Sequence, residues 1–182
     1  MNYVEPIRDV KTVQDIADYL KDKNEKYYIM YMIGIYSGLR ISDILKLKVR
    51  DVRGKSKISI REKKTGKEKL FPINRELAKA LESYCEGKKD YDYLVPSPRI
   101  ANKAVSREYA YQIMHDAGEQ FGLDNLGTHT MRKTFGYHFY LQTKDIVLLM
   151  KIFNHHDESK TLRYIGIEQT TIDKAMMKFS YK

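Results

Sequence analysis

The sequence predicts a single, mainly α-helical domain with one small antiparallel β-hairpin, an α+β fold. Three observations support this fold class. Apolar residues recur at helical spacing over most of the 182 residues. The period changes to alternation in Lys57-Ile58-Ser59-Ile60-Arg61, and another extended segment follows after a turn. The sequence shows no repeat, low-complexity tract or linker, and a chain of this length with 42% hydrophobic residues can bury one core.

The first third of the chain predicts three helices after a short extension at residues 1–10. Thr12 is typical of a helix N-cap and begins a helix over residues 12–22. A second helix is expected over residues 24–37, where Gly38 breaks the pattern. A third is expected from Ile41 to Lys48.

Turn and capping residues then mark a hairpin, two helices and a short strand. The expected elements are strands at residues 57–61 and 70–73, a helix from Asn74 to Cys85, a strand at Tyr93–Val95 and a helix from Ser106 to Phe121.

The rest of the chain is expected to be helical. The predicted helices cover residues 129–141, residues 144–153 begun by Thr143, and a short segment from Ser159 that carries Tyr164. The terminal segment, residues 166–182, has apolar residues at i, i+3, i+4 and i+7, namely Ile172, Ala175, Met176 and Phe179.

The charge balance indicates a polyanionic partner. Lys and Arg total 33 against 24 Asp and Glu, a net charge of +9. No segment is long and apolar enough to predict a membrane span, and no signal peptide is evident at Met1–Glu5. The single cysteine, Cys85, cannot form an internal disulfide and is expected to be a core residue. A cytoplasmic protein is therefore expected.

Residues suited to phosphoryl transfer onto a tyrosine follow one another along the chain. They lie in Ser37-Gly38-Leu39-Arg40-Ile41-Ser42-Asp43, in Lys64-Thr65-Gly66-Lys67, in His129-Thr130-Met131-Arg132, and in a histidine nine residues before Tyr164. Together these motifs resemble the tyrosine recombinase (phage integrase) family from about residue 10 to residue 165. The resemblance implies the catalytic-domain fold of that family and strand cleavage through a phosphotyrosine on Tyr164.

Arg40 and Arg132 are the candidate phosphate ligands, because a guanidinium donates two parallel hydrogen bonds and stays protonated. Asp43 lies three residues after Arg40 and is a candidate to orient it, or to form a plain surface ion pair. His129 precedes Arg132 by one helical turn, so both side chains are expected on one helix face. A histidine there can take the tyrosine proton near neutral pH. The family motif usually continues with a histidine where this chain has Lys133, a change expected to be tolerated.

The resemblance implies that Lys64 is the general acid that protonates the leaving 5′ oxygen, with Lys63 and Lys67 as competing assignments. His155 has the family spacing to Tyr164, although His156 leaves a one-residue ambiguity. The family usually has glycine before this histidine. Asn154 stands there and also tolerates a left-handed backbone.

The resemblance further implies double-stranded DNA as the partner, a homotetramer on two DNA sites, a monomer without DNA, and possible accessory DNA-bending factors. The origin implied is a phage or mobile element. No metal or other cofactor is expected, because the sequence has no Asp/Glu or Cys/His cluster at metal-ligand spacing. The family's separate N-terminal core-binding domain is expected to be absent from residues 1–182, and residues 166–182 are expected to dock on a neighbouring protomer or on their own domain. Two alternatives stay open: a non-catalytic DNA-binding or accessory module of the same fold, and a type IB topoisomerase-like enzyme.

Overall fold

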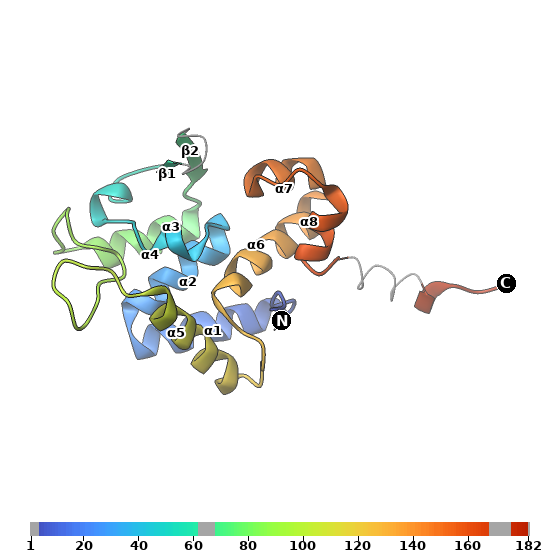
Figure 1. The fold of residues 1–182 in the computed structure, drawn as a ribbon, viewed down its shortest axis with the longest axis horizontal. Helices are drawn as coiled ribbons and strands as arrows, with labels where there is room; N and C mark the ends of the chain where they lie inside the picture. Colours follow the sequence, from blue (N-terminus) through green and yellow to red (C-terminus); the bar gives the residue numbers. More distant parts are fainter. Residues whose placement is uncertain (1–3, 62–67, 168–175, 182) are drawn as a thin grey trace.

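The computed structural model describes residues 4–61, 68–167 and 176–181. Helices dominate these residues, as the sequence predicted (Figure 1). The elements are α1 (Val10–Lys23), α2 (Glu25–Ser37), α3 (Ile41–Ile44), the 3-10 helix η1 (Val49–Asp51), β1 (Lys57–Arg61), β2 (Glu68–Pro72), α4 (Arg75–Cys85), α5 (Arg107–Gln120), α6 (Thr128–Thr143), α7 (Ile146–Phe153) and α8 (Glu158–Tyr164).

Helix α2 is the centre of the main core. It packs against α1, α4 and α6, and its residues Ile29, Met30, Tyr31 and Ile33 are fully buried. A helix with apolar residues on every side is stable only when other elements surround it. Helix α2 ends at Ser37 with Gly38 as its C-cap, and Arg132 on α6 donates to Gly38 O. The loop after α2 is therefore held beside the first turns of α6.

The predicted hairpin is confirmed. Strands β1 and β2 pair antiparallel, and Ile58 lies opposite Phe71. Both side chains of that pair are buried, while their neighbours along each strand are more exposed. This alternation attaches one face of the hairpin to the core.

The predicted helix from Ile41 to Lys48 is wrong in length, and the strand predicted at Tyr93–Val95 is wrong. The helix stops at Ile44, because the chain at Leu47–Val49 pairs with residues 92–94 instead. Leu94 N donates to Leu47 O at 3.0 Å and Val49 N donates to Asp92 O at 2.9 Å. Only an isolated antiparallel bridge between Lys48 and Tyr93 forms there.

Two predicted helix starts are also wrong. Helix α1 is capped by Asp9, whose carboxylate accepts from both N and Oγ1 of Thr12 at 2.7 Å. Helix α7 is capped by Asp145, because Thr143 still belongs to α6. A carboxylate just before the helix outcompetes a threonine that already lies inside it.

The caps predicted at Asn74 and Ser106 are confirmed, since each accepts a hydrogen bond from the third residue after it. The last predicted helix begins slightly earlier than expected, at Glu158 after the cap Asp157.

A second, smaller cluster joins α6, α7 and α8. Its buried members are Tyr137, Leu149, Phe153, Ile165 and Ile167. Gly136 allows this close packing, because a Cβ there would lie 2.7 Å from Ile165 Cγ2 and 2.8 Å from the Phe153 ring. The cluster fixes the end of α7 and the end of α8 against α6.

The N-terminal segment runs along α6 before α1 begins. Ile7 N donates to Thr134 Oγ1 at 2.9 Å, and Lys133 Nζ donates to Val4 O at 2.6 Å. Arg8 donates to Gly166 O, just after α8, at 3.3 Å. Residues 4–9 therefore belong to the packed body.

Residues 176–181 extend away from the body (Figure 1). Met176 is 74% exposed and Phe179 is 68% exposed. The other two members of the predicted apolar stripe, Ile172 and Ala175, lie outside the described residues.

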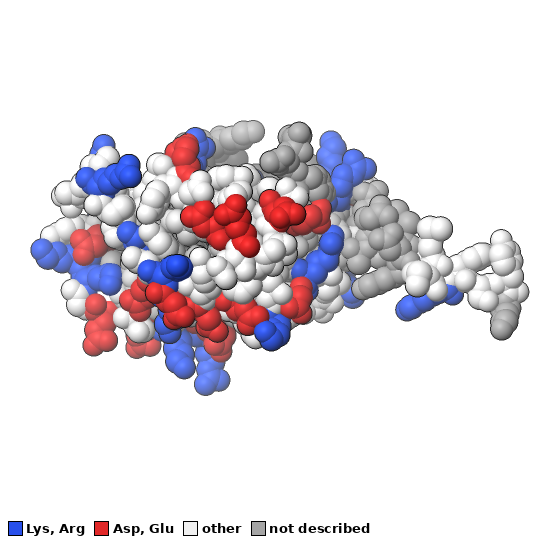
Figure 2. Space-filling view, turned by 90° about the horizontal axis from the view of Figure 1, so that it is seen from below, with Lys and Arg blue, Asp and Glu red and all other residues white. Residues whose placement is uncertain are grey.

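Charge is unevenly distributed over the surface. Figure 2, seen from below relative to Figure 1, shows Asp and Glu side chains gathered on one face. The helices at the bottom of Figure 1, α1 and α5, carry exposed acidic residues, namely Asp18, Asp22, Glu108, Asp116 and Glu119. No helix among the described residues is long and apolar enough to cross a membrane.

Candidate active site

The loop between α2 and α3 presents Arg40. Gly38 ends α2 with φ +65°, and a Cβ at this residue would lie 2.4 Å from the Phe135 ring. Only glycine satisfies both the left-handed backbone and this contact. Leu39 is then anchored in the core, and Arg40 follows as the exposed N-cap of α3.

Helix α6 places Arg132 in the interior beside this loop. Arg132 is only 4% exposed, and its guanidinium donates to the carbonyl oxygens of Gly38 and, at 3.0 Å, of Phe153. It also lies 4.0 Å from the centroid of the Phe153 ring. Burial lowers the pKa of Arg132 to about 10, so the side chain remains a cation at neutral pH.

His129 lies one turn earlier on α6 with an exposed surface. Desolvation lowers the pKa of its ring, and the charges of Arg132, Lys133 and Arg40 lower it further. These influences come from α6 and from the loop before α3, so the structure brings His129, Arg132 and Arg40 together. A pKa below the usual value keeps His129 largely neutral at pH 7, as a proton acceptor requires.

The end of α7 delivers His155. Asn154 adopts the left-handed conformation, with φ 56° and ψ 46°, as its place in the motif predicted. His155 N then donates to Met150 O at 2.9 Å. Burial lowers the pKa of the His155 ring, and the charges of Arg132 and Arg40 add to this effect.

Thr161 determines the tautomer of His155. The Thr161 hydroxyl donates to Asp157 O at 2.7 Å, so its oxygen is the acceptor in the 3.1 Å contact with His155 Nδ1. Nδ1 therefore carries the proton in the neutral ring, and Nε2 has the free lone pair. Thr161 is fully buried one turn before Tyr164 on α8.

Tyr164 is the last residue of α8 and is surrounded by these groups. Its ring makes edge contacts with His155 at 5.4 Å and with Phe153 at 5.8 Å between centroids. Lys133 Nζ lies 5.0 Å from the centre of the same ring. His156 is exposed, so His155 is the histidine in contact with Tyr164.

The pKa of Tyr164 is set by opposing effects. Burial raises the pKa, whereas the charges of Arg132 and Arg40 and a hydrogen bond with Arg132 lower it. Burial has the largest effect, so the phenol is protonated at neutral pH. It becomes a strong nucleophile only when a nearby base takes its proton.

Four of the six predicted catalytic residues thus lie around the fifth, Tyr164, and the sixth, Lys64, lies outside the described residues. Asp43 is near enough to raise the pKa of Arg132, and its Oδ1 lies 3.4 Å from Lys46 Nζ. Sequence reasoning did not identify Thr161 or the Phe153 carbonyl. Thr161 could have been identified from its position in the sequence, because a residue one helical turn before Tyr164 lies on the same helix face.

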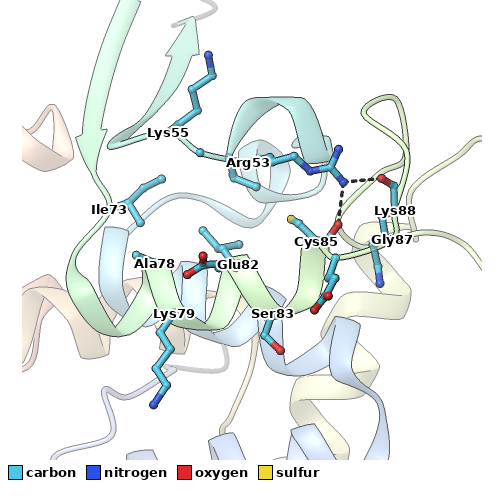
Figure 3. Close-up of a pocket in the computed structure, with 14 residues that line it drawn as sticks. Arg53, Lys55, Ile73, Ala78, Lys79, Glu82, Ser83, Cys85, Gly87 and Lys88 are labelled. Carbon is cyan, nitrogen blue, oxygen red and sulfur yellow. Dashed lines mark hydrogen bonds between the residues drawn. The ribbon is translucent and has the colours of Figure 1, made fainter.

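The large open cavity of the described chain lies elsewhere. It has a volume of about 1130 Å³ and lies beside α4 and η1, with none of the predicted catalytic residues in its wall (Figure 3). Arg53 on its rim is bound to Asp90 at 2.5 Å and donates to the backbone oxygens of Cys85 and Lys88. This arginine is committed to holding the end of α4. Cys85 is 2% exposed, as expected for a core residue.

One group of possible metal ligands was not anticipated from the sequence. Ligand atoms of His115, Asp116 and Glu119 on α5 lie within 4.8 Å of one another. Gln112 donates to Asp116 at 2.6 Å, and the carboxylates of Asp116 and Glu119 are exposed. We assign no metal to this group, because exposed acidic residues on a helix often lie this close without one.

The sequence matches the Phage integrase family over residues 8–170. It is 44% identical over 179 residues to a probable integrase/recombinase, YoeC, of Bacillus subtilis, with 98% of each chain covered. It is 28% identical over 173 residues to the tyrosine recombinase XerA of Pyrococcus horikoshii, covering 93% of this chain but 59% of XerA. The chain therefore spans little more than half the length of that relative.

Solved structures agree on the fold. A crystal structure of XerA recombinase superposes with a TM-score of 0.76 at 22% identity, covering 97% of this chain and 67% of that one. The site-specific recombinase XerH, bound to its palindromic difH substrate, superposes with a TM-score of 0.73 at 15% identity, covering 98% of this chain and 54% of that one. The domain has the fold of a recombinase catalytic domain, and the chain belongs to the phage integrase family of tyrosine recombinases.

Proposed function

We propose that this chain cleaves and rejoins double-stranded DNA at specific sites, through a 3′-phosphotyrosine on Tyr164, and that it comes from a phage or mobile element. One observation carries the proposal: Tyr164 lies among Arg132, Arg40, His129 and His155, which come from three different parts of the chain, namely the loop before α3, helix α6 and the end of α7. Two cations and two neutral histidines around a half-buried phenol match what transfer of a phosphoryl group onto tyrosine requires.

In the proposed reaction, the Tyr164 oxygen attacks the phosphorus of a DNA phosphodiester and the bond from phosphorus to the 5′ oxygen breaks. Arg40 and Arg132 stabilise the negative charge on the non-bridging oxygens. The phenolic proton passes to neutral His129 or His155, and Lys64 protonates the departing 5′ oxygen. Religation is the reverse reaction. It needs no nucleotide, because the phosphotyrosine retains the energy of the broken bond.

The experiment is incubation of the purified chain with nicked duplex substrates carrying its element's own site, followed by denaturing electrophoresis. Loss of the short fragment beyond the nick traps the intermediate as a covalent protein–DNA band. A band supports the proposal. Its absence would favour an accessory module, and relaxation of supercoiled plasmid without any specific site would favour a topoisomerase.

Lys64 is tested with a substrate whose leaving 5′ oxygen is replaced by sulfur. A thiolate leaves without protonation, since thiols have a pKa of about 8.5. We expect Lys64→Met to slow cleavage of the normal substrate by about 10²–10⁴-fold. With the sulfur substrate, the variant is expected to match the unaltered chain.

Lys63→Met and Lys67→Met are the matched controls, because each removes one lysine within three positions of Lys64 in the sequence. Both are expected to retain cleavage of either substrate. Rescue by sulfur in one of these variants instead of Lys64→Met would transfer the role of general acid to that lysine.

We further propose that the active form is a homotetramer on two DNA sites, acting in the bacterial cytoplasm, where its DNA substrate lies. In it, the apolar tail of one protomer, residues 176–181, occupies an apolar groove on the next. The groove has a volume of about 560 Å³, and Phe71, Phe135, Phe139, Leu148 and Ile152 contribute to its wall. The four large apolar residues of the tail are between 68% and 97% exposed.

Truncation after residue 175 is expected to leave the melting temperature of the monomer unchanged and to abolish tetrameric complexes in native gels of paired DNA sites. Full-length chain with Met176, Met177, Phe179 and Tyr181 changed to serine is expected to behave like the truncation, because it loses the same apolar contacts. A clear fall in the monomer's melting temperature would place the tail on its own domain, and tetramers formed without it would contradict the proposal.

A further inference from the structure

Lys69 connects the hairpin to the end of α7. Its Nζ donates to Lys151 O and to Ile152 O, each at 2.7 Å. The ammonium group also lies 5.7 Å from the centre of the Phe71 ring on the same strand. These contacts join β2 to a helix more than eighty residues later in the sequence.

The acceptors of Lys69 are among the last carbonyl groups of α7, which lack the i+4 hydrogen bond of the helix interior. Lys151 O also accepts from the N–H of the C-cap residue Asn154 at 3.4 Å. Met150 O accepts from His155 N, Lys151 O and Ile152 O accept from Lys69, and Phe153 O accepts from Arg132. A cation at a helix C-terminus also interacts favourably with the helix dipole. Lys69 and Arg132 therefore hold successive carbonyls at the point where the chain turns into His155.

The position of this turn controls two groups of the proposed site. The backbone continues from Ile152 through Phe153 and Asn154 directly to His155, whose ring contacts Tyr164. The Phe153 carbonyl in turn orients the Arg132 guanidinium. A small shift of the α7 end would displace both groups from a reacting phosphate.

We propose that Lys69 is a positioning residue for DNA cleavage. By binding the end of α7, it holds His155 and the Phe153 carbonyl in place, and it ties them to the hairpin whose sequence carries Lys64 five positions earlier. The proposal rests on the proposed function. The competing role for a lysine on a hairpin of a basic protein is a direct contact with a DNA phosphate, which contributes to binding but not to the geometry of the site.

The test compares Lys69→Met, Lys69→Arg and Lys57→Met. Methionine keeps the unbranched apolar side chain of lysine but has no donor, and arginine keeps the cation and the donors. Lys57 is an exposed lysine on β1, so its removal changes the charge of the hairpin equally. The measurements are DNA affinity and the single-turnover rate of covalent complex formation at saturating DNA.

We expect Lys69→Met to lower the rate at saturation by up to about a hundredfold, the loss that a displacement of about 1 Å produces. Its affinity should fall no more than that of Lys57→Met, and Lys69→Arg should restore most of the rate. An unchanged rate at saturation with weakened affinity would overturn the proposal in favour of a phosphate contact.

Amide hydrogen exchange in the DNA-free protein separates this proposal from the proposed function. In Lys69→Met, the His155 amide is expected to exchange faster than in the unaltered chain or in Lys57→Met, because the end of α7 is less restrained. If the unaltered chain forms no covalent complex, the proposed function fails and this exchange difference still reports whether Lys69 holds α7. Unchanged exchange would overturn the positioning role.

Discussion

Replacement of Tyr164 by phenylalanine is expected to abolish the covalent protein–DNA band. The substitution removes only the hydroxyl oxygen, which is the proposed nucleophile, and no other group on the ring can attack phosphorus. The ring contacts with His155 and Phe153 do not depend on the hydroxyl, so the site should keep its shape. Loss of the hydrogen bond with Arg132 should change the free energy of unfolding by no more than about 1.5 kcal/mol.

Tyr140→Phe is the matched control, because Tyr140 packs against the same small cluster but lies on α6. It should form the covalent band at the normal rate, and both variants should bind DNA like the unaltered chain. Persistence of the band in Tyr164→Phe would show that another of the 15 tyrosines is the nucleophile.

Replacement of Arg132 by lysine is expected to lower the cleavage rate by about 10²–10³-fold, although the positive charge is kept. A lysine lacks the planar fork that can bind two backbone carbonyls and still direct N–H groups at a phosphate. The magnitude is that found when one preorganised donor to a developing oxyanion is removed. The measurement is the single-turnover rate at saturating DNA.

Arg132→Lys should also reduce the stability of the fold. The guanidinium bridges Gly38 O and Phe153 O, and an unsatisfied buried carbonyl destabilises a protein by about 1–3 kcal/mol. Chemical denaturation measures this loss. Arg163→Lys, a change at an exposed position next to Tyr164, should affect neither quantity. A normal cleavage rate in Arg132→Lys would contradict the proposed role of Arg132 in binding the scissile phosphate.

Much of the local structure followed from the sequence. The caps at Asn74 and Ser106 and the hairpin strands were predicted, because capping and alternation depend on residues close in sequence. The caps at Asp9 and Asp145 were missed because a nearby threonine offered a competing pattern. The short α3 was missed because its end is set by backbone pairing of Leu47–Val49 with residues 92–94, a contact that no local pattern reveals.

The sequence by itself determined the order and spacing of the proposed catalytic residues. It also predicted that His129 and Arg132 share one helix face, because residues three positions apart on a helix lie on the same side. Only the tertiary structure decided what holds them. Arg132 is bound to Gly38 O across 94 positions of sequence, and the end of α7 is bound by Lys69 across more than eighty. Periodicity shows which face of a helix is buried, but it does not specify the partner. That choice depends on packing and hydrogen bonding among segments that meet only when the chain folds.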